Sequence, residues 1–189
     1  MLSHNVPNAA NVRIWVREWP WDGDSGRNWG SGLALFLSTF VNRIDRKGRV
    51  SVPAPFRTVL ATQTFPGVIA FPSFVVSAIE ASGIDRIERL SAGIDQFDPF
   101  SDEHDAFAIS ILADSHQLSF DSEGRIMLPE VLREHAGITE QAAFVGRGVT
   151  FQVWEPDAFR GYQEDARKRA REERGNLRLD GGTGGAPAA

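Results

Sequence analysis

A chain of 189 residues, 42% of them apolar, is long enough for one domain of usual size or two small ones with a packed core. It contains no cysteine, which excludes disulfides and thiolate metal sites. No apolar run approaches the roughly 18 residues of a membrane span, and the N-terminus lacks the pattern of a secretory signal, so we expect a cytoplasmic protein. The net charge of −5 argues weakly against bulk binding of nucleic acid.

Residues 1–33 are predicted to be an N-terminal extension, because they show little apolar periodicity. They hold four of the five tryptophans: Trp15, Trp19, Trp21 and Trp29. Three interpretations stay open. The segment is a partner-binding arm with aromatic anchors, a flexible extension that no core requires, or a stretch that is absent from the mature protein.

Residues 34–81 are predicted to form a unit of short strands around one helix. The strands are expected at residues 33–44, 49–52, 68–71 and 75–80. Asp45 and Gly48 are the preferred residues for the first and fourth positions of the turn between the first two strands. Pro55 suits the first turn of the helix, and Phe56, Val59 and Leu60 follow at the spacing of one helical face.

Residues 82–114 are predicted to connect this unit to the next through two helices. Ser82 is the expected N-cap of the first helix, which runs to about residue 97. Ser101 is the expected N-cap of the second.

Residues 115–158 are predicted to repeat the first unit. Strands are expected at residues 117–120, 125–128, 142–145 and 149–154, with a helix at residues 129–136 that Gly137 ends in the left-handed conformation. Residues 159–189 complete a charged helix that starts at Pro156. They end in a tail that is too rich in glycine to fold and is expected to be disordered. A solvated face with ion pairs at i,i+4 spacing is the simplest interpretation of that helix.

The two units share one motif at identical spacing. Asp45-x-x-Gly48-Arg49-x-x-x-Pro53-x-x-x-Arg57 recurs 76 positions later as Asp121-x-x-Gly124-Arg125-x-x-x-Pro129-x-x-x-Arg133. Such a repeat indicates one structural unit used twice. Four short strands and a helix bury little apolar surface alone, so the two units must pack on each other, within one chain or between chains.

The two copies differ in charge. Residues 43–57 carry five positive side chains and one negative, a net charge of +4, whereas residues 121–133 carry two positive and three negative, a net charge of −1. The first copy is therefore the better candidate for contact with nucleic acid.

Each Asp–Arg set has two compatible interpretations. The aspartate caps the turn while the arginine reaches back to its carboxylate and holds the hairpin. A guanidinium held in this way is also oriented for a guanine edge, and the neighbouring basic groups are available to phosphates. For Arg43, Arg46 and Lys47 the alternative to DNA contact is an ordinary solvated basic turn. A catalytic role for the paired aspartates is disfavoured, because an adjacent arginine lowers a carboxyl pKa and no nucleophile or metal-ligand set accompanies them.

The twin motifs, with Phe36-Leu37-Ser38-Thr39-Phe40 before the first and Phe144-Val145-Gly146 after the second, resemble the MraZ family of bacterial transcriptional regulators over about residues 34–160. The resemblance implies an α+β fold of two tandem SpoVT-AbrB-type swapped-hairpin units that form a pseudo-dimer resembling a double-psi barrel. It implies a ring-shaped homo-oligomer, associated with the nucleoid, that binds short direct repeats in double-stranded DNA upstream of its own gene. Such a protein acts mainly as a repressor of that promoter and of the division and cell wall cluster.

The motif and the resemblance together give the expected site. The expected DNA-binding residues are Arg43, Arg46, Lys47, Arg49 and Arg125, and the expected turn scaffold is Asp45, Gly48, Asp121 and Gly124. We expect no catalytic residue, no metal and no cofactor.

Two other functions remain as alternatives: an AbrB-like antitoxin and an interaction protein that does not bind DNA. Members of the family normally begin one to three residues before the Phe-Leu-Ser-Thr stretch, whereas 35 residues precede Phe36 here. We therefore expect residues 1–32 to be an over-extended reading frame with Leu33 as the native start. The intact mass of the protein from its own host tests this expectation.

Overall fold

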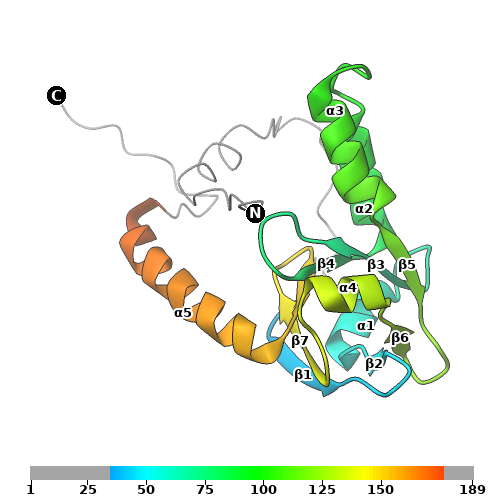
Figure 1. The fold of residues 1–189 in the computed structure, drawn as a ribbon, viewed down its shortest axis with the longest axis vertical. Helices are drawn as coiled ribbons and strands as arrows, with labels where there is room; N and C mark the ends of the chain where they lie inside the picture. The colour runs from blue at the N-terminus through cyan, green and yellow to red at the C-terminus, as the bar shows by residue number, and fades with distance from the viewer. Residues whose placement is uncertain (1–34, 177–189) are drawn as a thin grey trace, which may run out of the picture. The chain divides into compact units, whose positions relative to one another are not determined.

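The structure is a computed structural model that describes residues 35–176, so the expectations for the N-terminal extension and for the glycine-rich tail lie outside the described residues. The described chain has an α+β fold with antiparallel sheets and several helices (Figure 1). Its strands are β1 (Thr39–Arg43), β2 (Arg49–Ser51), β3 (Gly67–Pro72), β4 (Ile79–Ser82), β5 (His116–Ser119), β6 (Arg125–Met127), β7 (Gln141–Gly146) and β8 (Phe151–Trp154). Its helices are α1 (Ala54–Leu60), α2 (Ile84–Ile94), α3 (Asp102–Phe107), α4 (Glu130–His135) and α5 (Pro156–Glu172), with a π-helical turn at Ala108–Ala113 and a 3-10 turn at Arg174–Asn176.

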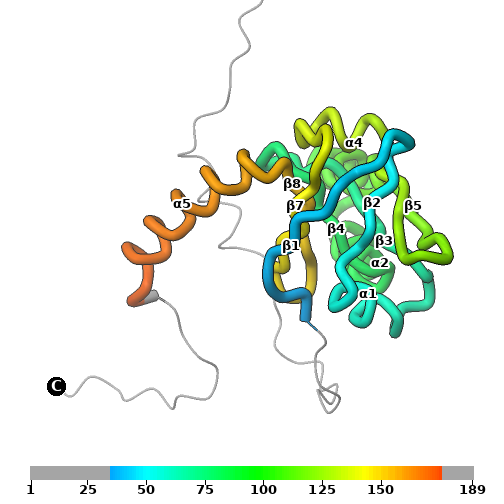
Figure 2. Tube along the Cα trace, turned by 90° about the horizontal axis from the view of Figure 1, so that it is seen from below, coloured from blue at the N-terminus to red at the C-terminus, as the bar shows by residue number. Residues whose placement is uncertain are grey.

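Strands from the two motif copies pair with each other. One sheet has the order β1-β7-β8-β4-β3-β5, in which β1 of the first copy lies beside β7 of the second and β5 of the second lies beside β3 of the first. Figure 2 shows β1 and β7 side by side from below. A separate two-stranded ribbon joins β2 to β6.

The ribbon relates the two copies symmetrically. Val50 lies opposite Ile126, its own counterpart 76 positions later. On either side, the amide of Val52 donates to the carbonyl of Gly124 at 3.2 Å, and the amide of Leu128 donates to the carbonyl of Gly48 at 2.9 Å. Each turn is therefore held by the strand end of the other copy. The return strand β2 makes only the single bridge Ile44↔Val50 to its own side of the turn, so it is not a simple hairpin partner of β1.

The core lies where the repeat pattern predicts it. Val50, Val52, Ile126 and Leu128 are all buried, because alternate residues of each ribbon strand face inward. Phe56 and Leu60 bury the predicted face of α1, and the Phe56 ring packs against four others, those of Phe36, Phe40, Phe144 and Phe151. This aromatic contact fixes α1 beneath strands from both copies.

A second apolar cluster supports the helices between the units. Phe71 of β3 packs with Ile94 of α2 and Ile111 of the π-helical turn. Ser101 caps α3 as predicted, since its hydroxyl accepts from the amide of His104 at 3.1 Å. Ser82 is not the N-cap of α2: it is the last residue of β4, and Gly83 takes the cap position.

The structure differs from the expectation at one strand and agrees with it at Gly137. The strand expected at residues 75–80 is β4 at Ile79–Ser82, because residues 74–78 form bends that leave Phe74 and Val75 exposed. Gly137 does adopt the predicted left-handed conformation, with φ 65°.

The charged helix α5 leaves the sheet after β8 (Figures 1 and 2), and Phe159 and Tyr162 in its first turns pack on Trp154.

Candidate nucleic-acid interface

The first turn is built around one carboxylate. Oδ1 of Asp45 accepts from the backbone amides of Lys47 at 2.9 Å and Arg49 at 3.0 Å. Oδ2 accepts from Nε of Arg49 at 2.7 Å and lies 2.6 Å from its Nη2. Gly48 completes the turn with φ 80°, a conformation that glycine adopts at little cost, and its amide donates to the carbonyl of Asp45 at 2.9 Å. The predicted interaction of the Asp45 carboxylate with the Arg49 guanidinium is confirmed.

These hydrogen bonds stabilise the ionised form of the carboxylate. The backbone amide of Arg49, followed by its guanidinium, lowers the pKa of Asp45 to about 2. The backbone amide and guanidinium of Arg125 lower the pKa of Asp121 in the same way. Both aspartates are therefore charged at neutral pH and serve as acceptors, which leaves them without a proton to donate as a general acid.

The second turn reproduces this geometry. Oδ1 of Asp121 accepts from the amides of Glu123 and Arg125 at 2.9 Å each, and Oδ2 accepts from Nε of Arg125 at 2.7 Å. Gly124 has φ 71°. The two turns thus have the same arrangement of hydrogen bonds.

The copies differ at the third position of the turn, where Lys47 in the first corresponds to Glu123 in the second. Oε2 of Glu123 lies 2.7 Å from Nη1 of Arg125, so the outer edge of this guanidinium is occupied. Nη1 of Arg49 has no hydrogen-bond partner within residues 35–176. The charge counts of the two copies do not reveal this contact, although the alignment of lysine with glutamate at equivalent positions carries the signal.

The ribbon formed by residues 49–51 and 125–127 presents one face outward. Arg49 lies opposite Met127, and Ser51 lies opposite Arg125, while the central pair faces the core. The two arginines therefore occupy diagonal corners of the same exposed face. Since each turn precedes its strand and the strands are antiparallel, the turns lie at opposite ends of the ribbon.

The remaining predicted residues lie around the first turn. Arg46 and Lys47 are exposed in the turn, and Arg43 is exposed at the end of β1. Arg57, which contributes to the positive charge of this copy, instead packs against the turn of the second copy, where a Cβ on Gly124 would overlap its guanidinium. The basic edge at the first turn therefore consists of Arg43, Arg46, Lys47 and Arg49.

Other kinds of site receive no support from the described part of the chain. Residues 35–176 contain no group of three or more histidine, cysteine or acidic side chains that could hold a metal ion. None of the described helices is both long and apolar enough to cross a membrane.

Comparison with known proteins places this chain in a family. A family model described as "MraZ protein, putative antitoxin-like" matches residues 111–179. Transcriptional regulator MraZ of Rickettsia canadensis (strain McKiel) is 54% identical over 146 residues, which cover 77% of this chain and 98% of the relative. The chain belongs to the MraZ family. The regulators of the same name from Rickettsia rickettsii (strain Sheila Smith) and Rickettsia akari (strain Hartford) are 52% and 51% identical, with the same coverage. Membership of the MraZ family gives the chain a role in the regulation of transcription.

Proposed function

We propose that this chain is a sequence-specific DNA-binding regulator that reads short direct repeats upstream of its own gene, mainly as a repressor. The first turn and the ribbon face form the reading surface. The observation that carries the proposal is the state of Arg49: Asp45 holds one edge of its guanidinium, and Nη1 has no partner among residues 35–176 on an exposed face. A guanidinium fixed in this way is suited to a bidentate contact with a guanine edge.

The surroundings of Arg49 supply contacts to phosphate. Arg43, Arg46 and Lys47 are exposed beside it, and phosphate contacts position a protein on the duplex without reading its sequence. The B-DNA major groove admits a two-stranded ribbon of the kind that β2 and β6 form. Arg125 is the weaker contributor, because Glu123 occupies Nη1 and places a negative charge at its end of the ribbon.

The proposed architecture explains how an acidic chain binds DNA. The units at residues 34–81 and 115–158 act as a SpoVT-AbrB-type pseudo-dimer within the chain, a proposal that the strand pairing between copies supports. A ring of several chains in the cytoplasm, associated with the nucleoid, presents one basic turn per chain to successive DNA repeats. Linked weak contacts of this kind gain about 10²–10⁴ in apparent affinity through effective concentration.

Binding to the DNA upstream of its own gene tests the proposal. Fluorescence anisotropy at several stated salt concentrations compares wild type with the variant Arg46→Ala/Lys47→Ala, and Ser122→Ala/Glu123→Ala in the second turn is the matched control. The first variant should weaken binding and lower the slope of log K against log salt by roughly 0.9 for each phosphate group that the variant no longer touches. The control should bind at least as tightly as wild type. Unchanged affinity and slope in the first variant, with its assembly intact, would show that the turn does not read DNA.

A further inference from the structure

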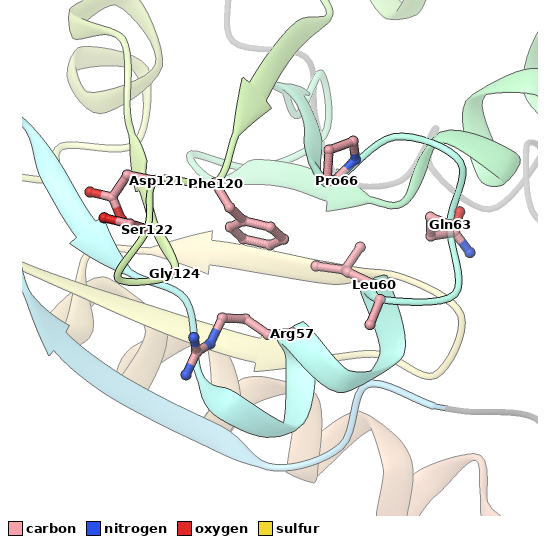
Figure 3. A pocket seen from close by; sticks show the side chains of 9 residues that line it. Arg57, Leu60, Gln63, Pro66, Phe120, Asp121, Ser122 and Gly124 are labelled. Atoms are coloured by element: carbon pink, nitrogen blue, oxygen red, sulfur yellow. The ribbon is translucent and has the colours of Figure 1, made fainter.

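A pocket of about 350 Å³ lies where α1 of the first copy meets the turn of the second. Its walls come from the end of α1, from the loop that follows it and from residues 120–124 (Figure 3). The lining residues are Arg57, Leu60, Ala61, Gln63, Pro66, Phe120, Asp121, Ser122 and Gly124. The exposed basic edge of the first turn does not line this cavity.

Arg57 is the unusual member of the lining. Its Nε is buried and has no hydrogen-bond partner, and no other atom of its guanidinium forms a hydrogen bond or ion pair within residues 35–176. Figure 3 shows the side chain reaching from α1 toward the turn at Gly124. A buried donor on a charged group is costly to leave unpaired, so its absence of a partner calls for an explanation.

The equivalent arginine in the other copy has a hydrogen-bond partner. Arg133 occupies the same position of the motif and packs near Gly48, but its Nε donates to the carbonyl of Leu128 at 3.3 Å. The repeat therefore offers a satisfied arrangement for this arginine, and Arg57 does not adopt it.

The remaining lining suits an anion with an apolar body. Ser122 supplies a hydroxyl with no partner among residues 35–176, and the Nε2 donors of Gln63 are likewise unused, since only its Oε1 is engaged by the amide of Asp85. Pro66 and Phe120 provide apolar surface next to the buried Leu60. The one carboxylate in the lining, that of Asp121, is already matched by two backbone amides and a guanidinium.

From this arrangement we propose that the pocket binds a small anionic ligand, a carboxylate or a phosphate monoester attached to an apolar or aromatic group. The Arg57 guanidinium binds the anion and the Phe120 side of the pocket covers the apolar group. The volume falls in the range of small-molecule sites, which are concave and mostly apolar with a few polar groups. A DNA strand is the less suitable occupant, because the acidic Glu123 flanks this turn and the cavity has apolar walls.

Titration of the ¹⁵N-labelled protein with phenyl phosphate tests the site. Inorganic phosphate is the probe for the anion alone, benzoate is the carboxylate probe, and phenol is the uncharged probe. Phenyl phosphate or benzoate should give saturable shifts at the amides of Leu60, Phe120 and Gly124 and a rise in melting temperature with ligand concentration. Phenol and inorganic phosphate should bind more weakly, because each lacks half of the interaction. Shifts that do not saturate, or that map elsewhere on the chain, would overturn the proposal.

Two variants separate this site from the DNA interface. Arg57→Gln should weaken phenyl phosphate binding by about tenfold or more, since the variant cannot form the charge-assisted hydrogen bond. Arg133→Gln, the matched change in the other copy, should leave it unchanged. Equal binding by wild type and a folded Arg57→Gln would refute the site, whatever either protein does with DNA. If Arg57→Gln instead reduces the salt slope of DNA binding while no small anion saturates wild type, Arg57 is a phosphate contact and the pocket proposal is wrong.

Discussion

The substitution Lys47→Glu should give the first turn the glutamate–arginine contact of the second. The new carboxylate lies at the position from which Glu123 reaches Nη1 of Arg125, so we expect it to capture the Nη1 of Arg49. The backbone scaffold should survive, because the amide of residue 47, rather than its side chain, donates to Asp45. The effect should therefore appear in DNA binding while the fold is retained.

The expected magnitude follows from the two DNA interactions that we propose for this turn and that the substitution removes. One phosphate contact contributes a salt exponent of about 0.9, which at about 0.15 M salt corresponds to about fivefold in affinity. A good contact of an arginine with a base edge is worth about 1–3 kcal/mol, and its lower limit is again about fivefold. Lys47→Glu should thus weaken binding to the upstream DNA by about 30-fold or more, with part of the effect specific to the cognate sequence.

The reverse substitution in the second turn is the counterpart of this test. Glu123→Lys frees Nη1 of Arg125 and replaces a negative side chain by a positive one, so binding should tighten by about fivefold through one added phosphate contact. Glu123 is 66% exposed, and water screens such an ion pair, so the stability of this variant should stay close to wild type. Anisotropy at fixed salt measures both variants, with circular dichroism as the folding check. The reasoning is refuted if both bind within about twofold of wild type, well inside the changes expected from one contact.

Three further predictions concern the scaffold and the core. Gly124→Ala should lower the free energy of unfolding in urea by about 1–3 kcal/mol through backbone strain and overlap, and by more than Gly148→Ala, which has φ 81° but open space around its Cβ; an equal cost at both positions would contradict this. Asp45→Asn should destabilise the fold at neutral pH, and its deficit should shrink as pH falls from about 4 toward about 2, because a lowered carboxyl pKa stabilises only the ionised form. A deficit independent of pH in urea titrations would argue against that origin. Phe56→Ala should lower the free energy of unfolding by about 3–5 kcal/mol in the same assay, since its ring is fully buried among other aromatic rings. A loss below about 1 kcal/mol would show that the Phe56 ring is not a main contributor to the stability of the core.

Local features of the fold could be predicted from the sequence because local chemistry determines them. Asp45 and Gly48 specify a turn by residue type, the helical spacing of Phe56 and Leu60 gives the buried face of α1, and each prediction is confirmed. The position of β4 could not be predicted in this way. The apolar pair at Val75 and Val76 has the composition of a strand, but it lies in a series of bends and the strand begins at Ile79.

Contacts between the two copies could not be predicted from the sequence. Three-residue strands carry too little periodicity to specify a partner, so the register of β2 with β6 depends on the packing of both units together. The contact of Glu123 with Arg125 is local, yet charge counting treats both as solvated side chains. The environment of Arg57 depends on the turn of the other copy, and no pattern near Arg57 indicates it.

The repeated scaffold fits the proposal that the first copy makes the main contact with DNA. In both turns the aspartate is satisfied by backbone amides and by its own arginine, so the side chains at the second and third turn positions are free to vary. The double exchange Lys47→Glu/Glu123→Lys tests this point, because it leaves the net charge of the chain unchanged and moves the reading group to the other end of the ribbon. We expect it to bind the upstream DNA about fivefold more tightly than Lys47→Glu alone, yet less tightly than wild type, since Arg46 remains at the first turn and Ser122 at the second. If the double exchange binds no better than Lys47→Glu, the second turn cannot reach DNA, and the two copies differ in their position on the duplex as well as in charge.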